Sequence, residues 1–327
     1  MRYKGLDSLK AIAAFLVVCI HVPFPGVFGD YFEDICCLAV PCFFMITGFF
    51  YPTTMAKGKE LKQIGKLTKL CFISLLAYFV WTFAFYKYTG QDFSYITSRL
   101  LSFNGIVKFL VFNNPFFVNH LWYLLAIVYV LVIVFIANKL KMKKLLMCSV
   151  PLLLLICIAL GRYSNVFFGQ FFSNDFSRNC YFFGLPFFCI GWFIAENHEK
   201  ITSKLSKKLL LVLIVLFALM GPVEHFVLEM LGLNMEGDVF FSTPFFAISV
   251  FLYCAYYTEG NETLALIGKK YSTAIYIVHV AFIDLIYDLV SKTALHDAYD
   301  YVAPFVVFAF SLATAWAWKS LTERKAS

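Results

Sequence analysis

About ten continuous apolar stretches follow one another along the chain, separated by short polar segments. A helix needs about 20 mostly apolar residues to cross a bilayer. Strands of a transmembrane barrel would instead appear as short segments of alternating polarity. We therefore predict an all-α integral membrane protein, whose spanning helices lie at residues 9–27, 34–52, 68–87, 120–138, 145–161, 179–196, 208–222, 239–257, 271–290 and 302–319.

The Lys and Arg residues set the predicted orientation of this bundle. With the N-terminus inside, the cytoplasmic segments hold most of the 27 basic residues, from Arg2 at one end of the chain to Lys325 at the other. Acidic residues such as Glu236 fall mostly on the outer side. Cytoplasmic loops carry an excess of Lys and Arg, so both termini are predicted to be cytoplasmic. The outer segments keep only Lys87, Arg99, Lys108, Arg162, Arg178 and Lys292.

The composition supports a lipid environment and excludes two other classes of protein. Hydrophobic residues make up 61% of the 327 residues, charged residues make up 14%, and the mean hydropathy is +0.78. An average soluble domain is about a quarter charged, so a soluble fold could not bury this much apolar surface. The net charge of +7 is divided among the segments between apolar stretches. Because it forms no single basic patch, a nucleic-acid partner is not expected.

The ten cysteines lie almost entirely within apolar stretches and show neither metal-ligand spacing nor pairing between loops. We interpret them as small hydrophobic residues, with the adjacent Cys36 and Cys37 as the one candidate exception. No metal site is predicted. Residues 1–327 are expected to form a single transmembrane domain with no cleavable signal, and a soluble domain could follow Ser327 in a longer protein.

Ionisable residues within a membrane are costly and are therefore candidates for function. His21 lies in the outer half of the first predicted helix, eleven residues after Lys10. Asp7 lies one helical turn before Lys10, where the two can pair. A neutral imidazole such as that of His21 can act as a general base. The alternative for His21 is a hydrogen-bonded structural histidine. The alternative for Asp7 and Lys10 is an interfacial ion pair whose lysine extends toward the headgroups.

Three further stretches carry polar or small residues at helix ends or within helices. Gly48 could serve close packing of helices. Trp122 could anchor its helix at the membrane interface, which is the interpretation that the residue type alone favours. In chain order, the stretches contain Thr47 and Gly48, His120 and Trp122, and Tyr276 and His279.

Together these stretches resemble the acyltransferase 3 family of membrane O-acyltransferases. In its first helix the family has an Arg, ten further residues and a His, and Lys10 and His21 keep that spacing here. The family's Phe-Phe-x-x-Ser-Gly-Phe motif is similar to residues 43–49, and its basic-x-x-basic pair is similar to Lys66 and Lys69. Further matches are Leu121-Trp122-Tyr123-Leu124, Arg178-Asn179 and Tyr276-Ile277-Val278-His279.

The resemblance implies transfer of an acyl group from cytoplasmic acyl-CoA, with acetyl-CoA as the expected donor, to a hydroxyl acceptor at the outer face. It implies that His21 is the general base, assisted by Asp7 and Lys10, and that Lys66 and Lys69 attract the phosphates of CoA. Lysine lacks the bidentate fork of the family's arginine, so phosphate would be held with less geometric control. The resemblance adds Thr47 (Ser in the family), Gly48, Trp122, Arg178, Asn179, Tyr276 and His279 as candidates for substrate binding.

The lysine pattern and the first helix are most similar to the membrane half of the vancomycin-resistance serine racemases. This similarity implies a second hypothesis, an L-serine transport domain with a fused or associated soluble racemase domain. A third hypothesis is a membrane anchor without catalysis. The expected partners are the lipid bilayer, acyl-CoA, and either a cell-envelope acceptor or L-serine. The expected location is the bacterial cytoplasmic membrane, which the chain would cross many times.

Overall fold

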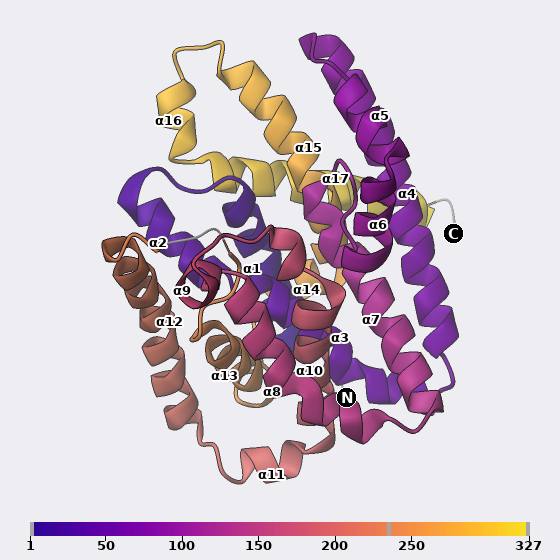
Figure 1. The fold of residues 1–327 in the computed structure, drawn as a ribbon, viewed down its shortest axis with the longest axis vertical. Coiled ribbons are helices and arrows are strands. Elements are labelled where there is room, and N and C mark those ends of the chain that lie inside the picture. Colours follow the sequence, from indigo (N-terminus) through magenta and orange to yellow (C-terminus); the bar gives the residue numbers. More distant parts are fainter. Residues whose placement is uncertain (1–2, 234–236, 325–327) are drawn as a thin grey trace. The chain divides into compact units, whose positions relative to one another are not determined.

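The computed structural model describes residues 3–233 and 237–324. Within these ranges it contains helices and no strands, which confirms the predicted all-α class (Figure 1). Arg2, Glu236 and Lys325, which enter the topology prediction, lie outside the described residues.

Each of the ten predicted stretches coincides with a helix. Seven of the described helices are long and apolar enough to cross a membrane, counting α3 together with the short helix that precedes it. The helices α10 and α13 are shorter, and α1 carries three charged residues. The ten helices are α1 (Lys4–His21), α3 (Ala39–Ala56), α4 (Glu60–Thr89), α7 (Trp122–Lys139), α8 (Lys143–Leu160), α10 (Leu185–Glu196), α12 (Lys207–Met230), α13 (Thr243–Tyr256), α15 (Ser272–Val290) and α17 (Ala303–Arg324).

Short helices occupy much of the segments that were predicted only as connections. They are too short or too polar to register as spans, so the apolar pattern does not reveal them. The longest segment predicted to lie outside, about 88–119, contains two of them, α5 and α6. These short elements are α2 (Gly26–Cys36), α5 (Ser94–Leu101), α6 (Phe103–Phe112), α9 (Ser164–Phe168), η2 (Asn174–Phe176), α11 (His198–Thr202), α14 (Glu262–Lys270) and α16 (His296–Asp300). Two more, η1 (Asn119–Leu121) and η3 (Cys180–Gly184), lie at the starts of predicted stretches.

The chain divides into two compact units. Unit 1 consists of Met1–Phe43, Thr202–Leu231 and Phe241–Ser327, and unit 2 consists of Phe44–Ile201 and Gly232–Phe240. Each unit therefore combines segments that are distant in the sequence.

In unit 1, α1 packs against α13, α14, α15 and α17. Two glycines allow this close approach. A Cβ atom at Gly5 would lie 2.0 Å from the carbonyl oxygen of Cys254, and one at Gly268 would lie 1.8 Å from that of Asp7. Helix α1 is therefore held at short range along its first turns. Further along it, a buried apolar cluster consists of Ala14, Val18, Ile275, Val307 and Ala315.

In unit 2, α3 and α10 approach each other closely. A Cβ atom at Gly48 would lie 1.9 Å from the carbonyl oxygen of Phe188, and one at Gly191 would lie at the same distance from that of Met45. Close helix packing, one of the two interpretations of Gly48, is therefore what the structure shows. The aromatic rings of Phe44, Trp122, Tyr123 and Phe183 pack beside this crossing.

Candidate functional site

Helix α1 presents three of the candidate residues on one face. Eleven residues make about three helical turns, so Lys10 and His21 share a face and lie about 16 Å apart along the axis. The Lys10 ammonium is 3.1 Å from a carboxylate oxygen of Asp7, so the ion pair expected from the spacing is present. Asp7 is buried, and Lys10 and His21 are partly buried. The face therefore carries a fixed charge pair at one end and an imidazole at the other.

His21 and His279 lie side by side within unit 1. Their ring centroids are 5.1 Å apart, and His279 on α15 is fully buried. The Nδ1 atom of His279 lies 2.8 Å from the carbonyl oxygen of Tyr276 and 3.3 Å from that of Ile275. A carbonyl oxygen can only accept, so Nδ1 carries a proton and donates it. Two residues singled out from distant parts of the sequence therefore form an imidazole pair.

Tyr276 belongs to the same surroundings. It precedes His279 by about one turn of α15 and is buried, and its ring lies 6.2 Å from that of His279. Five candidates therefore belong to unit 1. His21, Tyr276 and His279 form one group, and the Asp7–Lys10 pair lies about 16 Å from it along α1.

The other candidates belong to unit 2. Lys66 and Lys69 are exposed and lie in the first turns of α4, not in a loop. The 30 residues of α4 span about 45 Å, which exceeds the roughly 30 Å of a hydrocarbon core. The basic end of α4 therefore extends as a helix beyond the predicted span, with Lys66 and Lys69 about one turn apart along it. In α3, Thr47 shares a hydrogen bond with Tyr123.

Trp122 and Arg178 meet at a different place in unit 2. The Arg178 guanidinium carbon lies 5.9 Å from the centre of the Trp122 ring, and Nε and Nη2 donate to both carboxylate oxygens of Asp238. Trp122 is buried against Phe44 and Phe183. The indole therefore packs within the protein, and its role as an interfacial anchor stays a prediction.

Asn179 acts as a cap in the structure. Its side-chain oxygen Oδ1 accepts from the backbone N–H groups of Tyr181 and Phe182. Its side-chain nitrogen Nδ2 donates to the backbone carbonyl oxygens of Asp175 and Phe176. These bonds start η3 and the helix that follows it. The predicted substrate contact of Asn179 stays a prediction.

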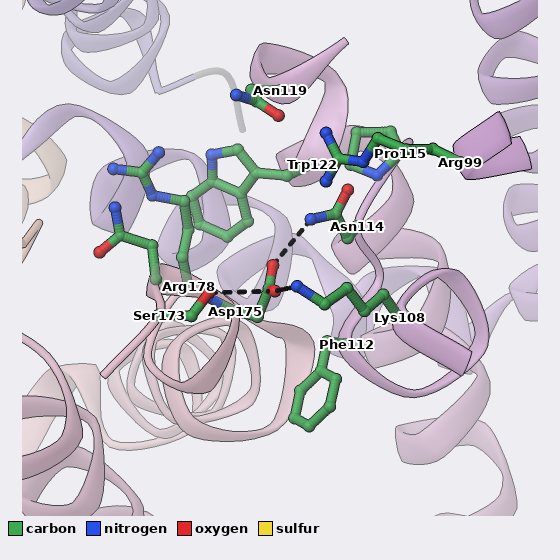
Figure 2. A pocket seen from close by; sticks show the side chains of 11 residues that line it. Arg99, Lys108, Phe112, Asn114, Pro115, Asn119, Trp122, Ser173, Asp175 and Arg178 are labelled. Atoms are coloured by element: carbon green, nitrogen blue, oxygen red, sulfur yellow. Dashed lines mark hydrogen bonds and ion pairs between the residues drawn. The ribbon is translucent and has the colours of Figure 1, made fainter. Parts of the chain in front are cut away.

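A polar pocket of about 260 Å³ adjoins Trp122 and Arg178 (Figure 2). Its other lining residues come from the connection before α7 and the connection after α8, where sequence reasoning assigned no site. Only the unequal distribution of basic residues could have drawn attention to Arg99 and Lys108. The lining consists of Arg99, Lys108, Phe112, Asn114, Pro115, Asn119, Trp122, Ser173, Asn174, Asp175 and Arg178.

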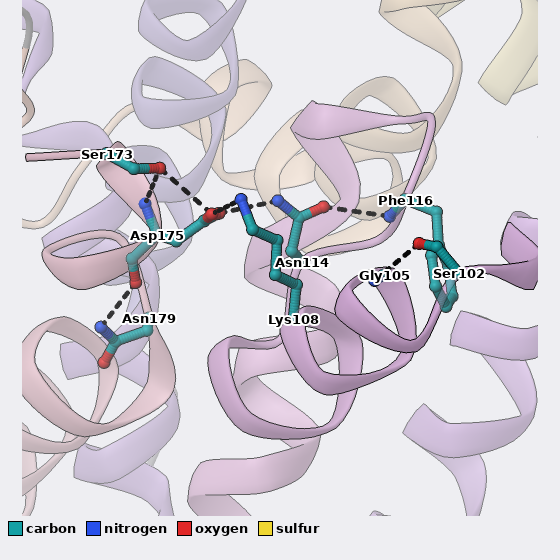
Figure 3. A network of polar contacts seen from close by, with 8 residues as sticks. All are labelled: Ser102, Gly105, Lys108, Asn114, Phe116, Ser173, Asp175 and Asn179. Carbon is teal, nitrogen blue, oxygen red and sulfur yellow. Dashed lines mark hydrogen bonds and ion pairs between the residues drawn. The ribbon is translucent and has the colours of Figure 1, made fainter. Parts of the chain in front are cut away.

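Asp175 is the centre of a hydrogen-bond network in this pocket (Figure 3). Its carboxylate accepts from the Lys108 ammonium at 2.7 Å, the Asn114 amide at 2.7 Å and the Ser173 hydroxyl at 3.1 Å. Burial acts to raise the pKa of Asp175, but the bonds from these three donors outweigh it and hold the pKa below its usual value. The network therefore joins α6 to the segment around η2 while Asp175 is ionised.

This shift predicts how the stability should depend on pH. A carboxyl group whose pKa is lower in the folded state stabilises that state above its unfolded pKa, which is about 3.9, and the benefit is lost as the pH falls through the folded pKa. Wild type should therefore unfold at a higher temperature than Asp175→Asn at pH 7. The difference should shrink once the pH falls below about 4. Equal midpoints at pH 7 would contradict the role given to Asp175.

Within residues 3–233 and 237–324, no group of three or more His, Cys, Asp or Glu side chains could hold a metal ion. All ten cysteines are free thiols. Cys36, one of the two adjacent cysteines, is buried and hydrogen-bonded to Cys19. A hydrophobic role for this residue agrees with its surroundings.

The apolar helices and the polar groups buried among them define a multi-pass helical membrane protein. Residues 3–320 match the model of the acyltransferase domain family, so the chain belongs to the acyltransferase 3 family. No solved structure matches the chain.

Similar curated proteins are racemases from enterococci. An amino-acid racemase of Enterococcus faecalis is 25% identical over 68% of this chain and 32% of its own length. A serine/alanine racemase of Enterococcus gallinarum is 28% identical over 67% of this chain and 33% of its own length. The chain therefore spans about a third of the length of the curated relatives that it matches.

Proposed function

We propose that the chain transfers an acyl group, with acetyl as the expected one, from acyl-CoA to a hydroxyl acceptor across the bacterial cytoplasmic membrane. The chain belongs to an acyltransferase family. The observation that carries the proposal is the contact between His21 and His279, on the face of α1 that also bears the Asp7–Lys10 pair. A proton acceptor and a fixed cation are the groups that such a reaction requires.

The reaction proceeds through two proton transfers, to His21 and from His21 to the leaving sulfur, and one exchange of bonds. His21 takes the proton of the acceptor hydroxyl, and the oxygen attacks the thioester carbonyl. A carbon–oxygen bond forms, the carbon–sulfur bond breaks, and CoA leaves with the proton as a free thiol. His279 positions the ring of His21, because its own ring is fixed through Nδ1.

The charged groups would bind the donor. An ammonium group is a point charge that attracts phosphate, and Lys66 and Lys69 lie exposed on the basic end of α4. Lys10 lies about 16 Å from His21 on the same face of α1, and the pantetheine arm of CoA separates its phosphates from the thioester. Asp7 holds Lys10 in place.

Transfer of radiolabelled acetyl groups tests this function. Membrane vesicles from bacteria with and without the chain are supplied with labelled acetyl-CoA, and the label that stays covalently bound to envelope material is counted. Incorporation that requires the chain is expected. Equal incorporation in both kinds of vesicle would contradict the proposal.

A second candidate function is L-serine transport as one part of a membrane racemase. Two observations favour it. The relatives are named as racemases, and the chain spans only about a third of their length. The same vesicles distinguish it from acyl transfer. Accumulation of labelled L-serine that requires the chain, without acetyl incorporation, would replace the first function by the second.

A further inference from the structure

Four lysines form a stripe along the first turns of α4, beginning at its N-cap residue. Successive members are three, four and three residues apart, so they stay on one face of the helix. All four are exposed. Among the described residues, no hydrogen bond or ion pair involves their ammonium groups, whereas Lys10, Lys108 and Lys143 are each paired with a carboxylate. This basic stripe consists of Lys59, Lys62, Lys66 and Lys69.

The basic stripe continues the exposed apolar face of α4. At about 100° per residue, the mean direction of the stripe lies about 50° from that of the large exposed apolar side chains of the predicted span. It lies about 130° from that of Cys71, Ser74 and Tyr78, which are the buried residues of this helix. An apolar face that the protein leaves uncovered along a spanning helix meets lipid, so the stripe is turned toward the surrounding membrane. The exposed apolar side chains are Phe72, Ile73, Leu76, Val80 and Phe83.

The length of α4 places the basic stripe at the membrane surface. As a helix, residues 70–89 are about 30 Å long, which matches the thickness of the hydrocarbon core. The turns from Lys59 to Lys69 add about 15 Å on the predicted cytoplasmic side. The headgroup layer begins where the hydrocarbon core ends. Lys66 and Lys69 therefore lie at the level of the headgroups, and Lys59 and Lys62 lie just beyond them.

The four charges of the stripe repel one another. Like charges three or four residues apart on a helix are unfavourable, and cations are unfavourable in the first turn, where the helix dipole is positive. Glu60 is the only acidic residue between Lys57 and Lys69, and it lies about 140° around the helix from the stripe. The local sequence therefore leaves the repulsion in place, and an external anion would stabilise this end of α4.

An anionic phospholipid matches this surface better than a soluble anion does. The stripe is an open face and not a cavity, and an ammonium group attracts phosphate without a fixed geometry. The flexible lysine stems can lie along apolar surface while the charges reach the headgroups. Clusters of about four to eight basic residues beside a spanning helix are typical of binding to anionic headgroups.

We propose that the basic stripe of α4 binds the headgroups of anionic phospholipids. Each lysine near an anionic membrane surface strengthens binding by about fivefold. The inference rests on α4 alone and not on acyl transfer. Lys66 and Lys69 are also the residues proposed to attract CoA, and the experiments below separate the two ligands.

Titration of the purified full chain with lipids tests the proposal. The probes are short-chain phosphatidylglycerol as the anionic lipid and short-chain phosphatidylcholine as the zwitterionic lipid, with bound lipid counted by native mass spectrometry. We expect phosphatidylglycerol to have the lower Kd, and this Kd to rise as the salt concentration increases. A Kd for phosphatidylglycerol equal to or above that for phosphatidylcholine would overturn the proposal.

Two variants with the same loss of charge assign the binding to the stripe. Changing its four lysines to glutamine should raise the Kd for phosphatidylglycerol by about tenfold or more. In the control, four exposed lysines of unit 1 are changed to glutamine, and the Kd should stay near that of wild type. The control residues are Lys204, Lys208, Lys269 and Lys270. Unfolding midpoints without lipid show whether each variant is folded. Equal losses in the two variants would show that the lipid responds only to net charge, and would overturn the proposal.

Free CoA distinguishes a soluble phosphate from a lipid headgroup. It is titrated into the same protein without added lipid. Binding of CoA to a chain that shows no preference for phosphatidylglycerol would assign the stripe to the acyl donor alone and overturn the proposal. Binding of phosphatidylglycerol that is weakened in the stripe variant, without binding of CoA, would support the lipid surface and count against the proposed donor site.

Discussion

Replacing His21 by alanine should lower the rate of acyl transfer by about 10²–10⁴-fold, the contribution typical of a general base. The acceptor hydroxyl would then have to attack the thioester without losing its proton to a positioned group. His21 lies at the last turn of α1, and its ring contacts His279. The rate of label transfer in vesicles measures the effect, and the KM for acetyl-CoA should change little.

His198→Ala provides a matched control. This histidine lies exposed on the short helix α11, so its loss should leave the rate near that of wild type. An effect of the same size in both variants, or a normal rate in His21→Ala, would remove His21 from the reaction. A loss of rate together with a loss of acetyl-CoA binding would assign His21 to binding of the donor and not to catalysis.

Adding one methyl group at Gly268 should have the largest effect on stability. In Gly268→Ala the Cβ atom would lie 1.8 Å from the carbonyl oxygen of Asp7, and a backbone atom cannot rotate away. Helix α14 must then move from α1, and overpacking of this kind costs about 1–3 kcal/mol or more. The unfolding midpoint in detergent should fall clearly. The rate of acyl transfer should also fall, because the substitution disturbs the helix at Asp7, whose carboxylate holds Lys10.

Gly65→Ala is the control for this substitution. Gly65 lies within α4, and no atom lies within 4 Å of a Cβ built there. Alanine favours a helix by up to about 1 kcal/mol over glycine, so this variant should be at least as stable as wild type. Equal midpoints for Gly268→Ala and wild type would show that the two helices are not in close contact.

The sequence predicted the spanning helices well because the cost of burying polar groups in lipid leaves a long apolar signal. The pairing of Asp7 with Lys10 was also predictable, since both lie on one helix and their spacing fixes their proximity. The short helices α5 and α6 gave no such signal. They are polar or short, and tertiary contacts determine their conformation.

The contacts between distant segments could not be predicted from the residues alone. His21 and His279 were both candidates, but in a bundle either ring could have faced another neighbour. Residue type suggested an interfacial position for Trp122 and gave no sign of its contacts with Phe44 and Phe183. Arg99 and Lys108 appeared only as two cations of the outer segments, and their pocket forms through folding.

The measurement that tests the central claim most directly is the thermal stability of the purified protein with and without acetyl-CoA. A ligand that binds only the folded state stabilises it by about 2.7 kcal/mol at a concentration of a hundred times its Kd. We expect a clear rise in the unfolding midpoint with acetyl-CoA, retained in His21→Ala and reduced when Lys66 and Lys69 are both changed to glutamine. No rise with acetyl-CoA, together with a rise with L-serine, would contradict acyl transfer and favour transport.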